Sequence, residues 1–171
     1  MAANKFIQYF VEGECEEKFI NAYKKGDKAY LKAGKVEVLN VVNKIVTEAR
    51  ARAIKQGTTV VFIYDIDKGN LDILKQNLNT IKTCSLATVL HVQSIQNFED
   101  EIVFSTSVSN IDDVFSTKGV DNFKEKFIDH KDIASKFKKI NFDKAKMWSR
   151  IDKQSVFKGF VTQSSLNFIR K

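Results

Sequence analysis

One stretch limits the possible folds more than any other: Val60–Tyr64, five apolar or aromatic residues in a row, which ends abruptly in Asp65-Ile66-Asp67. A continuous apolar run of this length, rich in β-branched residues, is typical of a strand buried on both faces of a parallel sheet. Lys68-Gly69-Asn70 follows as a turn signal. The stretch therefore predicts a central strand of an α/β protein. Its two carboxylates lie at the carboxyl end, the edge at which open α/β sheets bind ligands.

Strand and helix patterns alternate along the chain up to about residue 94. Strands are predicted at residues 5–11, 36–41, 58–64 and 85–92, and helices between them at about 15–23, 42–53 and 71–81. This order predicts right-handed crossovers, and hence a sheet of about four mainly parallel strands with helices on both faces. After residue 94 we expect a helix capped by Asn97 and amphipathic helices around 120–127, 133–137 and 142–148. Residues 155–169 are predicted to add either an edge strand or a last helix.

The chain length of 171 residues suits one domain with a substantial core. We expect residues 1–105 to form the α/β core and residues 106–171 to be a basic, mostly helical extension of the same domain. No apolar run approaches the length of a membrane span, and the first residues do not resemble a signal peptide, so a cytoplasmic protein is predicted. Cys15 and Cys84 lack metal-ligand spacing and are expected to be buried small hydrophobic residues.

The positive charge is concentrated at one end of the chain. Residues 118–171 carry 14 Lys or Arg and 6 Asp or Glu, whereas residues 1–117 carry 14 and 15, within a total net charge of +7. This asymmetry indicates either a polyanionic partner docking on the C-terminal part or a solvated lysine-rich surface. Trp148, which lies in this basic region, is expected either to stack on a base or, more simply, to pack in the core.

Acidic residues follow two of the predicted strands. Glu12 and Glu16 follow the first strand, and Asp65 and Asp67 follow the third. Since the carboxyl ends of parallel strands lie at one edge of the sheet, these side chains converge if the two strands are neighbours. Like charges near a core are costly unless a cation neutralises them, and hard divalent ions take oxygen ligands. The pattern favours Mg²⁺ or Mn²⁺, and the simpler alternative is a strand end at which one aspartate accepts from turn amides.

These motifs resemble the Toprim domain, which topoisomerases, bacterial primases, OLD-type nucleases of phage defence and their RloB-like relatives share. Glu12-Gly13-x-x-Glu16 after a strand and Asp65-x-Asp67 after a later strand carry the resemblance, about fifty residues apart. The resemblance covers roughly residues 5–105. Ser94–Ile102 is similar to the Ser/Asn-x-x-Phe-Glu segment of the RloB-like and OLD-type members, which implies that Glu99 helps to hold a metal. Ordinary capping chemistry at a helix start is the alternative for Glu99.

The resemblance implies a metal-dependent nuclease that cleaves DNA or RNA. Glu12, Asp65 and Asp67 would be its catalytic residues, and its metal ligands would be Glu12, Glu16, Asp65, Asp67 and Glu99. Family members often place a basic residue near the phosphate, for which the candidates are Lys68, Lys144, Lys146 and Arg150. OLD-type members often act with an ATPase in phage defence. The chain has no Walker A motif, so the expected ATPase partner is a separate chain.

Two other functions remain open at this point. A catalytically inactive Toprim-like module would keep the fold and bind nucleic acid or a protein without turnover, although such a module has no reason to keep repelling carboxylates together. A phosphatase of the haloacid-dehalogenase type is suggested by a strand followed by Asp-x-Asp. That family has the motif on its first strand with Thr or Val two residues on, whereas here the strand is the third and Gly69 occupies that place.

Overall fold

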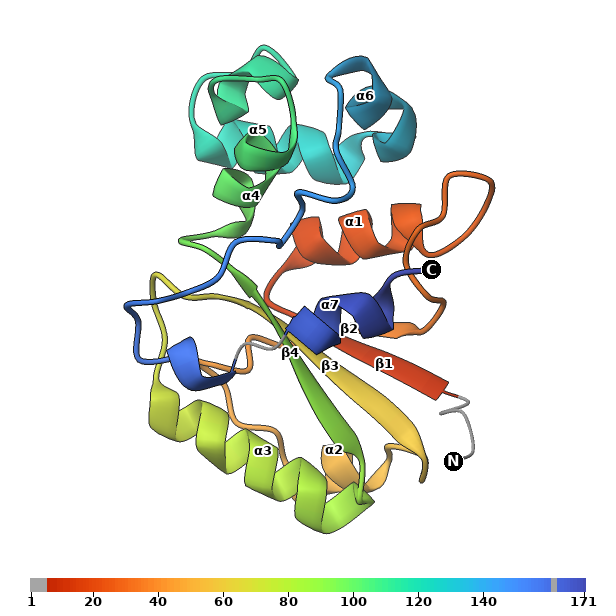
Figure 1. Cartoon of the computed structure of the whole chain (residues 1–171), viewed down its shortest axis with the longest axis vertical. Coiled ribbons are helices and arrows are strands. Elements are labelled where there is room, and N and C mark those ends of the chain that lie inside the picture. The colour runs from red at the N-terminus through yellow and green to blue at the C-terminus, as the bar shows by residue number, and fades with distance from the viewer. Residues whose placement is uncertain (1–5, 161–162) are drawn as a thin grey trace.

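The computed structural model describes residues 6–160 and 163–171, and in them it shows an α/β fold built on a four-stranded parallel sheet (Figure 1). The strands are β1 (Phe6–Val11), β2 (Lys35–Val38), β3 (Thr58–Asp65) and β4 (Thr88–Ser94), in the spatial order β2-β1-β3-β4. All three strand pairs are parallel. The predicted parallel sheet with flanking helices is therefore confirmed.

The apolar run of β3 is buried on both sides, as its composition predicts. Val61 and Ile63 belong to the core on one face of the sheet, and Val60, Phe62 and Tyr64 belong to the core on the other. Because successive side chains of a strand point to opposite faces, only a strand covered on both faces needs apolar residues at every position. β3 is thus a central strand with a helical layer on each side.

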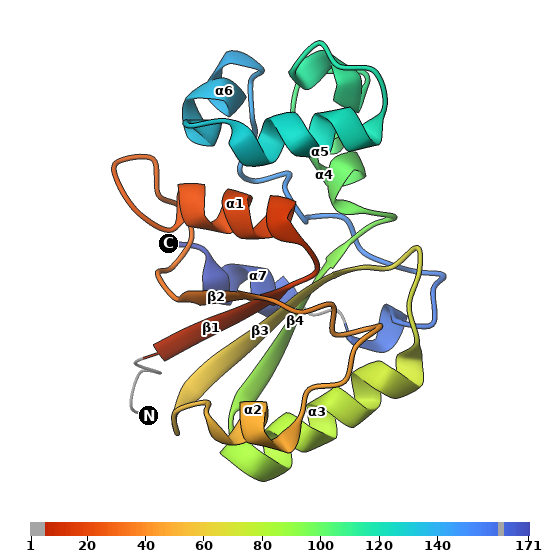
Figure 2. The same cartoon turned by 180° about the vertical axis from the view of Figure 1, so that it is seen from behind.

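Helices cover both faces of the sheet (Figures 1 and 2). α1 (Glu14–Tyr23) and α7 (Gln163–Ile169) lie on one face, and α2 (Glu48–Arg52) and α3 (Leu71–Ser85) lie on the other. The helices between consecutive strands bury their apolar sides against the sheet. Because the strands are parallel, every strand-to-helix turn lies at the carboxyl edge of the sheet.

The remaining helices extend the molecule beyond that carboxyl edge, next to α1 (Figures 1 and 2). They are α4 (Phe98–Ser105), α5 (Val120–Asp129) and α6 (Ile133–Lys139), with a 3₁₀ turn at Ile111–Val114. A second 3₁₀ turn, Lys158–Phe160, packs instead in the core on the α3 face of the sheet. Aromatic rings join α4 and α6 to α1: the ring centroid of Phe19 lies 5.6 Å from that of Phe98 and 5.9 Å from that of Phe137. The C-terminal extension therefore shares a core with the α/β part.

The predicted helix over residues 42–53 is wrong in its first half, because only Glu48–Arg52 is helical. Val41, Val42 and Val46 are buried in the irregular segment before it, where a side chain replaces helical hydrogen bonds. The Asn77 amide donates to the carbonyls of Val41 and Lys44, both at 2.8 Å, and its oxygen accepts from the Val46 amide at 2.7 Å. Apolar spacing alone does not distinguish this buried coil from a helix.

The predicted helix over residues 142–148 is also wrong, since this segment consists of turns. Asn141 and Trp148 have positive φ angles of 55° and 58°, which a helix does not accommodate. The predicted fourth strand begins three residues later than expected, because α3 continues to Ser85. In the tail, the helical alternative is correct for residues 163–169, and residues 161–162 lie outside the described ranges.

Cys15 is buried, as expected, whereas Cys84 is only partly buried, and both are free thiols. Within residues 6–160 and 163–171, no helix combines the length and the hydropathy needed to cross a bilayer.

Candidate metal centre

The two acidic strand ends meet at the carboxyl edge of the sheet. β1 and β3 pair in parallel with Val11 beside Ile63, so that Glu12, just after β1, and Asp65, the last residue of β3, are neighbours. The Glu12 carboxylate accepts a hydrogen bond from the Asp65 amide at 3.0 Å. The sequence predicts that these acids converge if the two strands are neighbours, and the two strands are neighbours.

Glu16 reaches the same place from the first turn of α1. Its side chain is only 5% exposed. Gly13, the N-cap of α1, leaves room for it, because a Cβ built at Gly13 would lie 3.3 Å from Oε2 of Glu16. The Glu-Gly-x-x-Glu pattern thus has a steric reason: the glycine lets the second carboxylate fold back over the helix start.

Glu99 completes the group from the first turn of α4. The predicted cap is confirmed, since the Asn97 side chain accepts from the Asp100 amide at 2.9 Å and fixes the helix start. Glu99 is 9% exposed and forms an ion pair with Lys124 of α5 at 3.3 Å. α5 therefore contributes a cation to an otherwise acidic site.

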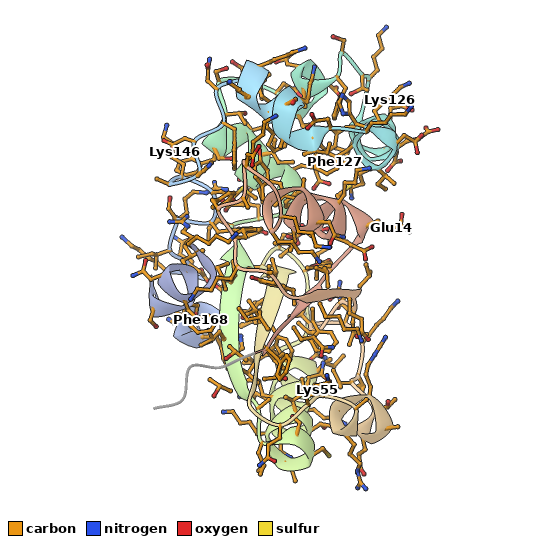
Figure 3. The ribbon with its side chains drawn as sticks, turned by 90° about the vertical axis from the view of Figure 1, so that its right-hand side faces the viewer. Glu14, Lys55, Lys126, Phe127, Lys146 and Phe168 are labelled. Atoms are coloured by element: carbon orange, nitrogen blue, oxygen red, sulfur yellow. The ribbon has the colours of Figure 1, made fainter. Side chains whose placement is uncertain are left out.

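Together these side chains line a small pocket of about 220 Å³, which we call the acidic pocket. Its lining consists of Glu12, Gly13, Glu14, Cys15, Glu16, Asp65, Glu99, Lys124 and Ile128. Figure 3 shows Glu14 and Lys126 of α5 on the same side of the molecule, which is the side on which α1 and α5 approach each other. Five carboxylates and one ammonium group line the pocket, so its negative charge is only partly neutralised from within.

Burial and mutual repulsion raise the pKa values of the pocket acids. Burial, followed by the nearby charges of Glu16 and Glu12, raises the pKa of Asp65 to about 9 against the opposing hydrogen bond from Ser94. Burial also raises the pKa of Glu16 to about 7, and its own amide acts in the opposite direction. In the absence of a cation, these carboxyl groups tend to hold protons at neutral pH.

The pKa of Lys124 is raised as well. Burial lowers its pKa, but attraction to Glu99, Cys15 and Glu16 outweighs burial and raises the pKa above its usual value. The pocket therefore favours positive charge, whether it comes from protons, from an ammonium group or from a metal ion.

The donor set fits a hard divalent cation. All four of the inward carboxylates, Glu12, Glu16, Asp65 and Glu99, offer oxygen ligands of the kind that Mg²⁺ and Mn²⁺ take. Oδ1 of Asp65 is buried and accepts no hydrogen bond from the described residues, which is costly unless something else binds it. No three His, Cys, Asp or Glu side chains among the described residues are already arranged as a ligand set. Glu12 is held by the Asp65 amide and Glu99 by Lys124, so binding an ion requires these contacts to rearrange.

Asp67 does not line the acidic pocket. It is exposed in the loop after β3, and its amide donates to the Gln96 carbonyl at 3.1 Å. Its charge still affects Glu12. Burial raises the pKa of Glu12, the hydrogen bond from the Asp65 amide lowers it, and the charge of Asp67 raises it further. The four convergent acids are thus Glu12, Glu16, Asp65 and Glu99, with Asp67 outside them.

Arg150 is engaged within the protein rather than free for a phosphate. It donates to Glu101 from Nη2 at 2.8 Å, to Asp100 at 2.9 Å and to the Ile95 carbonyl at 3.3 Å. Glu101, fully buried, also accepts from the amides of Ile95 and Trp148. This network ties the C-terminal segment to α4, and contact of Arg150 with nucleic acid stays a prediction.

The three predicted lysines are exposed at separate places. Lys68 follows β3, Lys144 lies 5.5 Å above the ring of Tyr30, and Lys146 lies on the opposite side from Glu14 in Figure 3. None of the three lines the acidic pocket. Trp148 packs in the core, where its ring centroid lies 5.5 Å from that of Phe19, and the simpler of the two expectations for it holds.

Lys124 is the cation of the acidic pocket, and the sequence does not reveal it. It lies between Phe123 and Phe127, which are both fully buried, and it is one of many lysines in the C-terminal third. Only its position beside the buried stripe of α5 could have singled it out, and exposed lysines commonly flank such stripes.

Comparison with protein-family models, curated proteins and solved structures finds no match for the chain. The function is therefore inferred from the geometry of the chain and from the resemblance of its motifs.

Proposed function

We propose that the chain is a nuclease that depends on Mg²⁺ or Mn²⁺ and hydrolyses phosphodiester bonds in DNA or RNA at the acidic pocket. The observation that carries the proposal is the convergence of Glu12, Glu16, Asp65 and Glu99 around one pocket with a single ammonium group. A divalent ion bound there would neutralise phosphate charge and make a water molecule more acidic.

A purely structural role explains this group poorly. Structural buried acids are normally matched by donors, as Glu101 is by Arg150 and two amides. In the acidic pocket the carboxylates instead raise each other's pKa values, and an oxygen of Asp65 is left without a donor among the described residues. Such an arrangement costs stability, which favours a functional reason for keeping it.

The residues would divide the work by position. Asp65 and Glu16, the most strongly perturbed acids, would hold the cation, with Glu12 and Glu99 turning toward it from the two sides. Lys124, once released from Glu99, could donate to a phosphate oxygen, because its ammonium group already lies at the pocket. Asp67 lies too far out in its loop to line the pocket and would act at its rim.

The experiment is incubation of the purified chain with single- and double-stranded DNA and RNA in Mg²⁺, Mn²⁺ or EDTA. We expect cutting with the metals, none with EDTA, and a loss of at least about a hundredfold in Asp65→Asn, because electrostatic stabilisation of this kind contributes about that much. Asp72→Asn is the matched control, since Asp72 is an exposed aspartate at the start of α3. Binding without cutting under all conditions would overturn the proposal and favour the inactive binding module.

The motif resemblance also supports a role in phage defence beside a separate ATPase. Bacteria that express the chain with its genomic neighbours would then survive phage infection better than bacteria that express Asp65→Asn. Equal survival of the two strains would contradict the defence role without affecting the nuclease proposal.

A further inference from the structure

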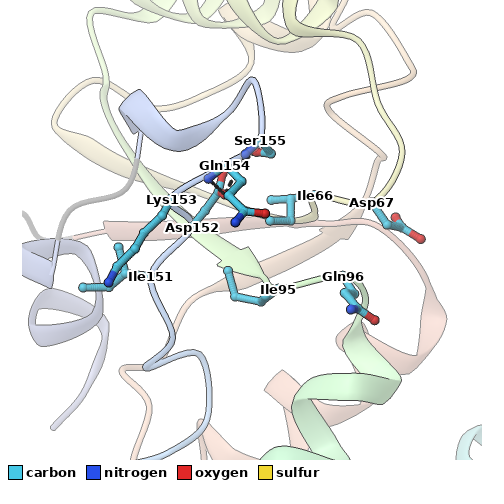
Figure 4. Close-up of a pocket in the computed structure, with 9 residues that line it drawn as sticks. All are labelled: Ile66, Asp67, Ile95, Gln96, Ile151, Asp152, Lys153, Gln154 and Ser155. Carbon is cyan, nitrogen blue, oxygen red and sulfur yellow. Dashed lines mark hydrogen bonds between the residues drawn. The ribbon is translucent and has the colours of Figure 1, made fainter.

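A second and larger pocket, of about 550 Å³, lies at the same carboxyl edge of the sheet, beyond β3 and β4 (Figure 4). Three segments form it: the loop after β3, the loop after β4 and part of the C-terminal extension. Its lining consists of Ile66, Asp67, Ile95, Gln96 and residues 151–155. We call it the isoleucine pocket. Nothing in the proposed chemistry of the acidic pocket accounts for it.

The two pockets are adjacent along the backbone. Asp65 lines the acidic pocket, and the next two residues, Ile66 and Asp67, line the isoleucine pocket. Two steps of chain span at most about 7 Å. That span is comparable to one nucleotide step of an extended strand, so a strand with its phosphate at the acidic pocket can place a neighbouring base in the isoleucine pocket.

The lining combines apolar walls with a polar group that is free to bind. Ile66, Ile95 and Ile151 supply the walls, and Ile151 is 57% exposed and therefore accessible to a ligand. Figure 4 shows the carboxamide of Gln154 beside Ile66. This carboxamide makes no hydrogen bond to the described residues, so it offers both donors and an acceptor.

The walls are held in place before any ligand arrives. The loops after β3 and β4 are joined by the hydrogen bond from the Asp67 amide to the Gln96 carbonyl, and the Glu101–Arg150 network holds Ile95 by its amide and its carbonyl. Gln96 has a φ angle of 68°, a conformation that non-glycine residues rarely adopt and that clusters at functional sites.

On the third side, the Asp152 carboxylate fixes the turn of the C-terminal segment. It accepts from the amides of Gln154 and Ser155, both at 2.9 Å. These hydrogen bonds fix the backbone from which the Gln154 side chain extends. A pocket that is ordered in advance loses little entropy on binding, so even a small ligand can bind usefully.

We propose that the isoleucine pocket is a nucleobase subsite that takes one unpaired base of a strand whose phosphate lies at the acidic pocket. A base has flat apolar faces and a polar edge, which match the isoleucine walls and the Gln154 carboxamide. Bases within a duplex are stacked and paired and cannot enter such a pocket without being flipped out. The inference rests on the proposed nuclease function and narrows its substrate to single-stranded nucleic acid.

The test is binding of short fluorescent strands of about ten nucleotides, measured by anisotropy in Ca²⁺, which takes oxygen ligands as Mg²⁺ does and so neutralises the acidic pocket, with denaturing gels to check that the probes stay intact. The probes are single-stranded DNA, single-stranded RNA, the same strands with abasic sites, and a duplex. The variants are Ile151→Ser and Gln154→Ala. Val156→Ser is the control, because Val156 is 63% exposed in the same segment and does not line the pocket. Ile151 and Gln154 are both exposed, so these substitutions leave the core intact.

The natural chain is expected to bind intact single strands about tenfold more tightly than abasic strands or the duplex, as loss of one stacked base predicts. Ile151→Ser should abolish this preference, Gln154→Ala should weaken it, and Val156→Ser should leave it unchanged. Equal binding of intact and abasic strands, no binding at all, or equal effects of Ile151→Ser and Val156→Ser would overturn the subsite. The DNA and RNA probes report which sugar the strand carries.

The subsite and the nuclease fail separately. Base-dependent binding without metal-dependent cutting would leave the subsite standing and remove the proposed reaction. Cutting that depends neither on abasic sites nor on strandedness would support the proposed reaction and overturn the subsite.

Discussion

Two regions of this protein bury acidic side chains, and they treat them in opposite ways. Glu101 is fully buried and receives hydrogen bonds from two backbone amides and from Arg150. In the acidic pocket, Asp65 has a buried oxygen that accepts none from the described residues, and its pKa is raised to about 9 by burial and by Glu16 and Glu12. Burial raises the pKa of Glu101 as well, but the Ile95 amide, Arg150 and the Trp148 amide act against burial and favour the ionised form.

Glu101 is thus an acid that stabilises the fold, whereas the acids of the acidic pocket are ones that the fold only tolerates. A matched buried ion pair loses stability when one partner is removed, because the other charge is left unpaired. Replacing one member of a group of mutually repelling acids should change stability little, because the replacement also relieves repulsion. Stability measurements can therefore test the functional reading of the acidic pocket without any knowledge of the substrate.

The largest effect is expected at Glu101. Glu101→Gln leaves the Arg150 guanidinium, which is 25% exposed, without its main partner, and should lower the free energy of unfolding by about 3 kcal/mol in urea denaturation. Asp100→Asn is the control: its carboxylate contacts the same arginine at 36% exposure and should cost less than about 1 kcal/mol. If Glu101→Gln were as harmless as Asp100→Asn, the contrast between the two regions would break.

The next largest effect is a change of stability with pH. The folded-state pKa of Asp65, about 9, lies far above that of an aspartate in the unfolded chain, and Glu16, at about 7, is raised as well. The folded state therefore binds more protons than the unfolded state, and stability without metal falls as pH rises through these values. Between pH 7 and 9 we expect a fall of about 2–3 kcal/mol, most of it from Asp65.

The pH window and the control follow from other titrating groups. Burial lowers the pKa of His91 to about 4, which makes stability rise with pH up to about 6.5, so the measurement starts at pH 7. Burial raises the pKa of Cys15 to about 12 and adds a fall above about pH 8.5 in every variant that keeps the thiol. The informative quantity is thus the difference from Asp65→Asn, whose stability should fall less. Parallel pH profiles for the two proteins would show that Asp65 is not perturbed.

A smaller effect is expected from metal addition at pH 7.5. Mn²⁺ or Mg²⁺ at several times its Kd should raise the free energy of unfolding by about 1 kcal/mol, because it binds the folded state only. Asp65→Asn should show no such gain, and Glu101→Gln should keep it despite its lower stability. Thermal unfolding with and without EDTA measures the difference. Equal stabilisation of the natural chain and Asp65→Asn would place the ion elsewhere.

The sequence predicted the sheet better than the connections around it. The apolar run of β3 and the acids at two strand ends follow local rules, so both the parallel sheet and the meeting of Glu12 with Asp65 could be inferred. The buried coil before α2 could not, because it depends on Asn77, which lies about thirty residues further along and supplies its hydrogen bonds.

The same distinction applies to the candidate site. Glu12, Glu16 and Asp65 are set by strand ends and one helix turn, and their spacing is readable. Lys124 enters from a helix whose place over α1 is decided by aromatic packing, such as that of Phe127 against Phe98. The hydrogen bond of Arg150 to the buried Glu101 could not be inferred from the sequence, because the two residues are about fifty positions apart in the chain.

The smallest effect, and the sharpest test of the acidic pocket, is expected at Lys124. Lys124→Gln removes the ammonium group that pairs with Glu99 at 3.3 Å. Because the lysine is 48% exposed, the cost without metal should be about 0.5 kcal/mol. With Mn²⁺ present the cost should shrink, since the ion neutralises the same carboxylates and the ammonium is no longer needed. Lys126→Gln, an exposed lysine of the same helix that does not line the pocket, should change neither value. If Lys124→Gln cost as much with saturating Mn²⁺ as in EDTA, lysine and metal would not share a site, and the acidic pocket would be an ordinary ion pair like that of Glu101.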